Sequence, residues 1–305
     1  MIRRRLTVRI YVSFKGTSPI TVTGATGAIG RLVVAGLLDA GHTVRGMSRD
    51  PQRAALPDGA DVVFGDLDDP STLTHAFDGA AQLVLIAVPE TVEAVVSRAE
   101  QAGVEHVVVV SSAAVTAGYD TTYNAVVEQA VMESRLDWSI VRPGEFATNS
   151  LLVWGPEIKA KRRAVEPFPD QIGHPIHEAD VADVVLANLL DPHRRGRIDT
   201  IIGPDSLTKR EQVAVIAEAI GEQITLDEVS AEQARNFYRD QGGFAAANAD
   251  FLFGFASYDG VAGITDEPHD TRAPDDDAYL TLDQITGTQA RTFRRWAHDH
   301  APDFT

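Results

Sequence analysis

Three glycines spaced three residues apart constrain this chain more than any other feature. Gly24, Gly27 and Gly30 follow an apolar run, Pro19–Thr23, and precede a segment with apolar residues at helical spacing. Such a turn needs glycine for the sharp bend, for close approach of the backbone to a pyrophosphate, and for tight packing of the helix on the strand. The helix N-terminus then offers unpaired N–H groups and a positive dipole to phosphates. We interpret the turn as a dinucleotide-binding loop rather than a purely structural turn.

Strand-like and helix-like segments alternate after this turn. Predicted strands rich in Val, Ile and Leu lie at 42–47, 60–64, 83–87, 106–110 and 138–141. The predicted helices between them are a short one that starts at Asp50-Pro51, and then 70–77, 91–102 and 122–134. Strands that are continuous in apolar residues are typical of a parallel sheet buried on both faces. Repeated βα units of this length predict an α/β fold, a Rossmann-type doubly wound parallel sheet.

The alternation loosens after residue 143. A helix at 180–190, a strand at 199–202 and a helix at 206–220 are still predicted. We therefore predict a basic N-terminal extension, an NAD(P)-binding Rossmann domain, and a smaller, mostly helical C-terminal cap that binds substrate. Their boundaries are 1–17, then 18–143 plus 177–221, then 144–176 plus 222–305.

The first seventeen residues carry five basic side chains and no acid. Apolar and polar residues alternate there, which favours an added edge strand or a basic arm, although a dispensable leader is the simpler interpretation. Arg9 interrupts the apolar run that a signal peptide needs, and nothing approaches the length of a membrane span. We expect a cytoplasmic protein.

Charge and composition narrow the partners. With 27 Lys+Arg against 44 Asp+Glu, the net charge is −17, which disfavours nucleic acid and anionic membranes as partners. The absence of cysteine excludes disulfides and Cys-ligated metals. His174, His177 and Glu178 lie in a Gly/Pro-rich segment before a helix, so we interpret them as packing and capping residues and predict no metal site. The expected partner is a small-molecule substrate, and a homodimer is left open.

The residues just after the predicted strand 42–47 indicate which cofactor is bound. An acidic residue there would bind the ribose 2′-OH and select NAD. Here Arg49 follows Ser48, and a guanidinium can pair with a 2′-phosphate. We therefore predict NADP, with NADPH preferred over NADH. The alternative is that Arg49 simply pairs with Asp50 at the surface.

Five motifs together resemble the NmrA-like family, a branch of the atypical short-chain dehydrogenases that includes NADPH-dependent quinone reductases and redox-sensing regulators. The motifs are Thr23–Arg31, Ser48–Pro51, Gly65–Leu67, Val110–Ser112 and Trp138–Gly144. The resemblance covers residues 18–305 and specifies the branch better than the substrate.

Carried over position by position, the resemblance implies a set of cofactor contacts. The pyrophosphate would lie against Gly24, Thr26, Gly27, Ala28, Ile29 and Gly30. The 2′-phosphate would meet Arg49, the adenine Asp66 and Leu67, the ribose Ala87 and Val88, and the nicotinamide Ser111 and Pro143. The substrate cleft would begin at Phe146 and Asn149. For Leu67, Ala87, Val88 and Pro143, packing at strand ends is the plainer interpretation.

The sequence departs from the wider superfamily at the proton donor. Classical members pair a tyrosine with a lysine four residues later, whereas here Tyr123 is followed by Val127. The four lysines, Lys15, Lys159, Lys161 and Lys209, all lie outside this helix. A simple ketone would thus lack its usual acid. A quinone accepts hydride to give a delocalised oxyanion that water can protonate.

Two hypotheses of different class follow. The first is an NADPH-dependent oxidoreductase that transfers a hydride to a quinone or similar conjugated acceptor, with Ser111 and, more weakly, Tyr123 as candidate catalytic residues. The second is a non-catalytic NADP(H)-binding redox sensor that acts through a protein partner.

Overall fold

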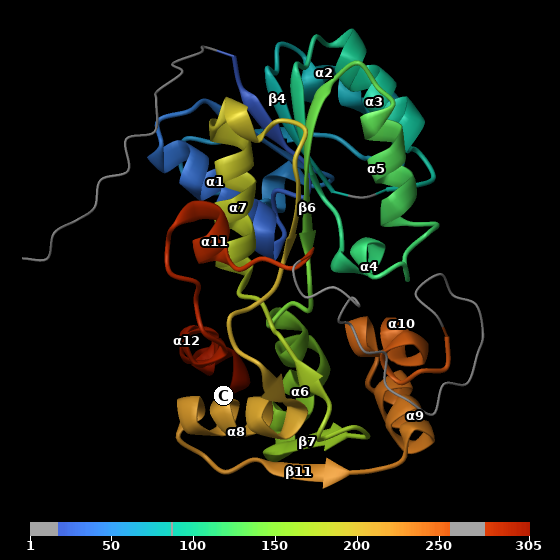
Figure 1. The fold of residues 1–305 in the computed structure, drawn as a ribbon, viewed down its shortest axis with the longest axis vertical. Coiled ribbons are helices and arrows are strands. Elements are labelled where there is room, and N and C mark those ends of the chain that lie inside the picture. The colour runs from blue at the N-terminus through green and yellow to red at the C-terminus, as the bar shows by residue number, and fades with distance from the viewer. Residues whose placement is uncertain (1–17, 87, 257–277) are drawn as a thin grey trace, which may run out of the picture.

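The computed structural model describes residues 18–86, 88–256 and 278–305, and its centre is a seven-stranded sheet (Figure 1). The strand order is β3-β2-β1-β4-β5-β6-β9, and every neighbouring pair is parallel. The strands are β1 (Ile20–Val22), β2 (Val44–Ser48), β3 (Asp61–Phe64), β4 (Gln82–Ile86), β5 (His106–Val110), β6 (Asp137–Pro143) and β9 (Ile198–Ile201). The predicted Rossmann-type doubly wound sheet is confirmed.

Helices cover both faces of this sheet (Figure 1). One face carries α1 (Ala28–Asp39), α7 (Glu178–Leu190) and α11 (Leu282–Thr286). The other carries α2 (Leu73–Phe77), α3 (Val92–Gln101) and α5 (Asn124–Met132). Short helices occupy connections at η1 (Pro51–Arg53), η2 (Pro70–Thr72), α4 (Ala113–Thr116) and η3 (Pro192–Arg194).

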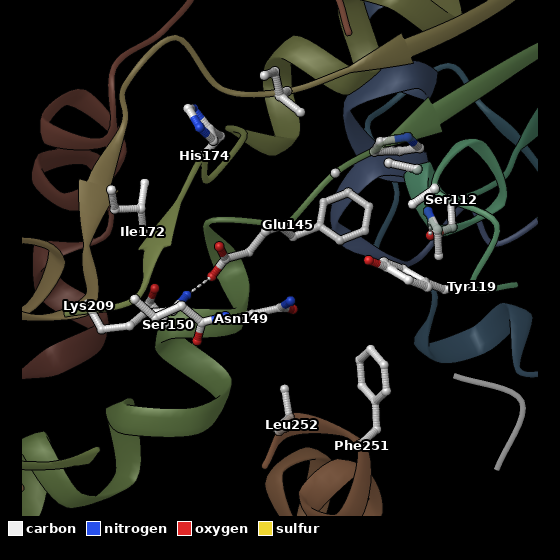
Figure 2. A pocket seen from close by; sticks show the side chains of 18 of the residues that line it. Ser112, Tyr119, Glu145, Asn149, Ser150, Ile172, His174, Lys209, Phe251 and Leu252 are labelled. Carbon is white, nitrogen blue, oxygen red and sulfur yellow. Dashed lines mark hydrogen bonds and ion pairs between the residues drawn. The ribbon is translucent and has the colours of Figure 1, made fainter. Parts of the chain in front are cut away.

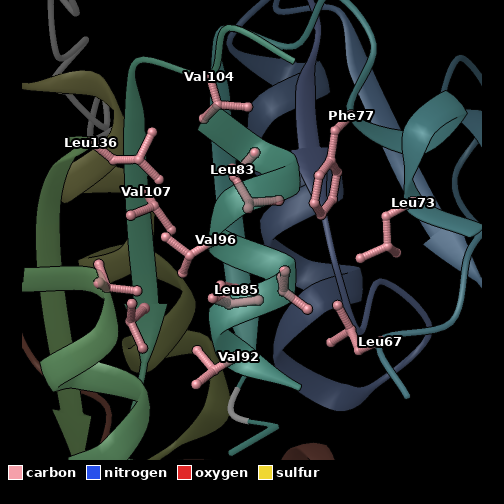
Figure 3. Packing of buried hydrophobic residues seen from close by; sticks show 14 of the residues in the cluster. Leu67, Leu73, Phe77, Leu83, Leu85, Val92, Val96, Val104, Val107 and Leu136 are labelled. Atoms are coloured by element: carbon pink, nitrogen blue, oxygen red, sulfur yellow. The ribbon is translucent and has the colours of Figure 1, made fainter. Parts of the chain in front are cut away.

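The two faces have separate apolar cores, and strand β5 contributes to both. Val107 and Val109 pack against α3 and α5, whereas Val108 points to the α1 and α7 side. All three valines are fully buried. Alternate residues of a strand point to opposite faces, so a continuous valine run is what a sheet covered on both sides requires. Figure 3 shows the packing of the first core.

A second unit lies at one end of the sheet (Figure 1). Its helices are α6 (Thr148–Lys161), α8 (Lys209–Ile220), α9 (Ala231–Gln241), α10 (Gly243–Leu252), α12 (Phe293–Asp299) and η5 (Ala301–Phe304). It also holds two small sheets that the sequence does not predict. They pair β7 (Arg163–Glu166) with β11 (Thr225–Glu228) in parallel, and β8 (Ile172–Gly173) with β10 (Leu207–Thr208) antiparallel.

The packing of α8 bears on the predicted boundaries, which assign it to the Rossmann domain. Val213 and Ile216 of α8 lie in the apolar core of the second unit, together with Trp154 and Trp296. We therefore propose that the cap includes α8, while the nucleotide-binding domain includes β9 and α11.

The basic extension 1–17, Ala87 and residues 257–277 of the predicted cap lie outside the described residues. Within the ranges that are described, no helix combines the length and apolar composition needed to cross a bilayer.

A polar cluster ties the C-terminal segment to the start of α7. His177 caps α7 through Nδ1, which accepts from the Ala179 N–H at 3.1 Å. His300 shares a hydrogen bond between Nε2 and Glu178 Oε1 at 2.7 Å and stacks on Trp296. The Glu178 carboxylate, more than any other group, raises the pKa of His300 to about 9. Asp180 pairs with Arg291, so these acidic side chains bind neighbouring protein groups.

This cluster predicts a pH-dependent contribution to stability. Because the folded-state pKa of His300 is raised from 6.5 to about 9, its stabilisation is full below pH 6.5 and is lost as the pH rises through 9. The bond to a charged group, reduced by partial exposure, should contribute about 1 kcal/mol. In urea titrations between pH 6 and 10, His300→Gln should lower the free energy of unfolding most at pH 6 and least at pH 10.

The exposed His298 offers a matched control. His298→Gln should leave the free energy of unfolding nearly unchanged across this range. A His300→Gln deficit of constant size at all pH values would show that loss of the Trp296 contact, not the ion pair, explains the effect.

Candidate active site

The glycine turn closes on itself before α1 begins. Gly24 has φ +59°, a left-handed conformation that favours glycine. The Gly27 N–H donates to the Gly24 carbonyl at 2.9 Å, and Gly27 is the N-cap of α1 without a side-chain capping bond. Thr26 and Ala28 beside it are exposed, and Ile29 is half-buried. The first N–H groups of α1 are thus presented at the surface where phosphate oxygens can meet them.

Close contact holds this turn to the sheet. A Cβ atom at Gly30 would overlap the Gly24 carbonyl oxygen, so only glycine lets α1 start this near to the strand. Thr23 Oγ1 donates to the Val84 carbonyl at 2.9 Å and accepts from the Ile86 N–H at 3.1 Å. The turn is therefore anchored to β4 as well as to β1.

Arg49 lies exposed just beyond the end of β2. Its neighbour Asp50 is paired with Arg53 at 3.6 Å, and among the described residues no ion pair involves Arg49. The alternative pairing with Asp50 is thus not seen. Sequence reasoning missed Arg31, whose guanidinium binds carbonyl groups of Thr26, Ala54 and Ala55 and so links the turn to the segment after η1.

Two of the four residues expected around adenine and ribose, Leu67 and Val88, pack into an apolar core with their side chains. Leu67 is 6% exposed and belongs to the core beside α2 and α3, and Val88 packs against the same core. Asp66 is half-buried, and its carboxylate accepts from the Asp68 N–H at 3.1 Å. Ala87 lies outside the described residues.

Ser111 is 7% exposed and points away from the open site. Its hydroxyl donates to the buried carboxylate of Glu128, which also binds Arg142 Nη2 at 2.5 Å. Arg142 in turn donates to Thr116 Oγ1 at 3.0 Å. The neighbouring Ser112, rather than Ser111, lines the cavity described next.

A cavity of about 810 Å³ lies where the carboxyl ends of β5 and β6 meet the cap (Figure 2). Phe146 and Asn149, expected in the substrate cleft, both line it, as does Pro143. Trp154 lines the cavity as well. Sequence reasoning missed several other contributors, most of which come from segments distant in the chain. These are Tyr119, Glu145, Glu166, Lys209, Phe251 and Leu252.

The two ends of the cavity differ in character. Tyr119 and Phe251 present aromatic rings on one side, with Ser112 nearby (Figure 2). Glu145 and Lys209 form an ion pair on the other side. An apolar, aromatic wall with a few convergent polar groups is the usual form of a small-molecule site.

Tyr123 is 45% exposed at the start of α5 and is not among the residues that line the cavity. Partial burial, followed by the nearby Glu90 and Asp68 carboxylates, raises its pKa above the ordinary value. Tyr119 lines the cavity instead, with Lys209 at the opposite end (Figure 2). The weak catalytic assignment of Tyr123 gains no geometric support.

A parallel sheet in this order, a glycine turn at the first helix, and a cavity at the carboxyl ends of the strands define a Rossmann-type dinucleotide-binding protein. A family model described as NAD(P)H-binding matches residues 24–192, and the chain belongs to this NAD(P)H-binding family. The resemblance to NmrA-like proteins and the prediction of an NAD(P) cofactor are confirmed.

Three similar proteins are reductases. The (4-alkanoyl-5-oxo-2,5-dihydrofuran-3-yl)methyl phosphate reductase of Streptomyces griseus is 32% identical over 93% of this chain and 99% of its own length. The NAD(P)H azoreductase of Xenophilus azovorans is 29% identical over 93% and 99%. The structure of the NADPH-dependent quinone oxidoreductase of Escherichia coli with NADPH has a TM-score of 0.72 at 20% identity, covering 92% and 99% of the two chains.

The close approach at Gly30 predicts an unusual response to alanine. Alanine at a helical glycine normally stabilises by about 1 kcal/mol, but here the new methyl group would displace the turn. Gly30→Ala should lower the free energy of unfolding by about 1–3 kcal/mol and weaken NADPH binding, as measured by urea unfolding and calorimetry.

Gly36→Ala makes the same change one and a half turns along α1. There the methyl group meets the flexible end of Leu186, which can rotate. NADPH affinity should be unchanged in this variant. Equal effects of the two substitutions on NADPH affinity would argue against a special role of the turn.

Proposed function

We propose that the protein is an NADPH-dependent oxidoreductase that transfers a hydride to a quinone or a similar conjugated acceptor. The observation that carries this proposal is the aromatic-walled cavity at the carboxyl ends of β5 and β6, next to the elements that bind NAD(P)H. A flat acceptor could lie against Tyr119 and Phe251, which line the same side of the cavity (Figure 2).

The proposed reaction needs no general acid or base from the protein. Bound NADPH would supply a hydride to the acceptor and leave as NADP⁺, and one proton from solvent would complete the hydroquinone. Because the negative charge on a reduced quinone is spread over the ring, water protonates it without a tuned side chain. The chain then mainly positions the acceptor and excludes competing reactions.

The names of the similar reductases support this choice of acceptor. An azo compound, an unsaturated lactone and a quinone all carry an electron-poor π system that accepts hydride. Arg49 supports NADPH over NADH, because its exposed guanidinium lies beyond β2 without a partner among the described ion pairs.

A second candidate is a non-catalytic NADP(H)-binding sensor that acts through a protein partner. The direction of Ser111 favours it, because a hydroxyl that donates to Glu128 does not donate to a bound acceptor. Binding of NADPH without turnover of any acceptor would support this candidate.

Removal of the Arg49 side chain should discriminate between the two nicotinamide cofactors. A bond to a charged group contributes about 1.5–3 kcal/mol, so Arg49→Ala should weaken NADPH about tenfold to a hundredfold more than NADH. Calorimetry with both cofactors measures this difference. Arg53→Ala, which removes a nearby exposed arginine paired with Asp50, serves as the control. Equal weakening of both cofactors by Arg49→Ala would refute the 2′-phosphate assignment.

The acceptor range tests the hydride transfer itself. NADPH consumption, followed by absorbance, should be steady with quinones and azo compounds and absent with simple ketones and aldehydes. Tyr123→Phe should leave kcat/KM for quinones unchanged, because Tyr123 does not line the cavity. Tyr119→Phe should cost less than about tenfold, the size of one lost hydrogen bond.

A valine side chain at position 27 would fill the space that the pyrophosphate needs. Gly27→Val should therefore abolish turnover, and this result would show that the reduction uses NADPH bound at the glycine turn. Loss of a general acid typically lowers the rate on the order of 10²–10⁴-fold. A decrease of that size in kcat/KM for either tyrosine variant would support a ketone reductase instead.

A further inference from the structure

The ion pair at the far end of the cavity sits in an unusual place. Lys209 is the first residue of α8, where the helix dipole opposes a positive charge. Its side chain is 15% exposed and that of Glu145 is 22% exposed, so both charges are largely removed from water. Removing one partner of such a pair leaves an uncompensated buried charge, which is costly.

The backbone on both sides holds the pair in position. The Glu145 carbonyl accepts from the Ile176 N–H at 2.7 Å, and the Lys209 N–H donates to the Gln171 carbonyl at 3.0 Å. Gly173 between these segments lies against the Glu145 carboxylate, which would collide with any side chain there. The absence of a side chain at Gly173 therefore leaves room for the Glu145 carboxylate in the position where it pairs with Lys209.

The Glu145–Lys209 pair itself carries no net charge. Besides His174, the charged or acidic side chains that line the described cavity are Glu145, Glu166 and Lys209. Burial raises the pKa of Glu166, while Lys209 and the Phe168 N–H, which donates to its carboxylate at 3.0 Å, act in the opposite direction. Nearby Asn149 and Ser150 are neutral.

We infer that the Glu145–Lys209 pair sets the substrate specificity of the cavity. It selects acceptors whose end remote from the reacting ring carries a neutral group that both accepts and donates hydrogen bonds, such as a carboxamide or hydroxyl, and it excludes acceptors with a charged tail. This inference rests on the proposed function.

The physical basis is the complementarity of the pair. The ammonium of Lys209 has N–H donors beyond the one given to Glu145, and the carboxylate has free acceptor positions. A neutral amide satisfies both at once. A carboxylate or ammonium tail would add a third, unpaired charge beside two charged side chains that are largely removed from water, and such a charge is disfavoured.

A matched series of acceptors tests the inference. We would use 1,4-naphthoquinones with one short side chain ending in a carboxamide, a carboxylate, an ammonium or a methyl group. Two readouts are needed: kcat/KM with NADPH, and Kd measured by calorimetry on the NADP⁺-loaded protein. The carboxamide should be preferred by at least about tenfold over both charged tails.

Single substitutions in the pair should change which tail is preferred, because each leaves one charge without its partner. Glu145→Gln leaves Lys209 unpaired, so the carboxylate should gain at least about tenfold relative to the carboxamide. Lys209→Gln leaves Glu145 unpaired and should favour the ammonium instead. The exchanged pair, Glu145→Lys with Lys209→Glu, should keep the carboxamide preference. Lys159→Gln removes an exposed lysine outside the cavity and should give the wild-type pattern.

The two readouts separate the possible failures. If the single variants change all four quinones by the same factor, the specificity role is overturned even when turnover is rapid. If the charge pattern is seen in Kd but no quinone is reduced, the specificity role is supported and hydride transfer to quinones is refuted.

Discussion

The approach of α1 to the first strand is the contact on which the site depends. Because Gly30 has no side chain, α1 starts directly against the Gly24 carbonyl, and the turn is free to expose helix N–H groups. Thr23 fastens the same turn to β4. These contacts place the N-terminal end of α1 beside the carboxyl ends of the central strands, where the connections after β5 and β6 line the cavity.

The sheet could be predicted from sequence because its signal is local. A run such as Val107–Val110 identifies a strand buried on both faces wherever it pairs. The small sheets of the cap carry no such signal, because β7 and β8 are short and pair with segments far along the chain. The sequence also does not show which core α8 joins, because an amphipathic pattern shows that a helix has an apolar face but not which core receives it.

Some residues of the candidate site could likewise be predicted from the sequence, and others could not. Phe146 and Asn149 follow a strand that ends at the cavity, so their place could be predicted from the topology. Glu145 gains its importance from Lys209, which is brought to it by a distant helix. Ser111 and Ser112 are adjacent and chemically alike, yet one binds Glu128 in the interior and the other faces the cavity. Strand geometry sends neighbours to opposite sides, and the sequence does not show which side is open.

The composition of the cap core has a consequence for the order of folding during synthesis. Its buried residues come from α6, α8 and α9 and also from Phe293, Trp296 and Phe304 near the C-terminus. Strands β1 to β6 of the nucleotide-binding sheet, by contrast, are complete by residue 143. A nascent chain can therefore close much of that sheet early, while the cap core stays open to water until residues 293–304 have left the ribosome. During that interval its apolar surface is available to chaperones.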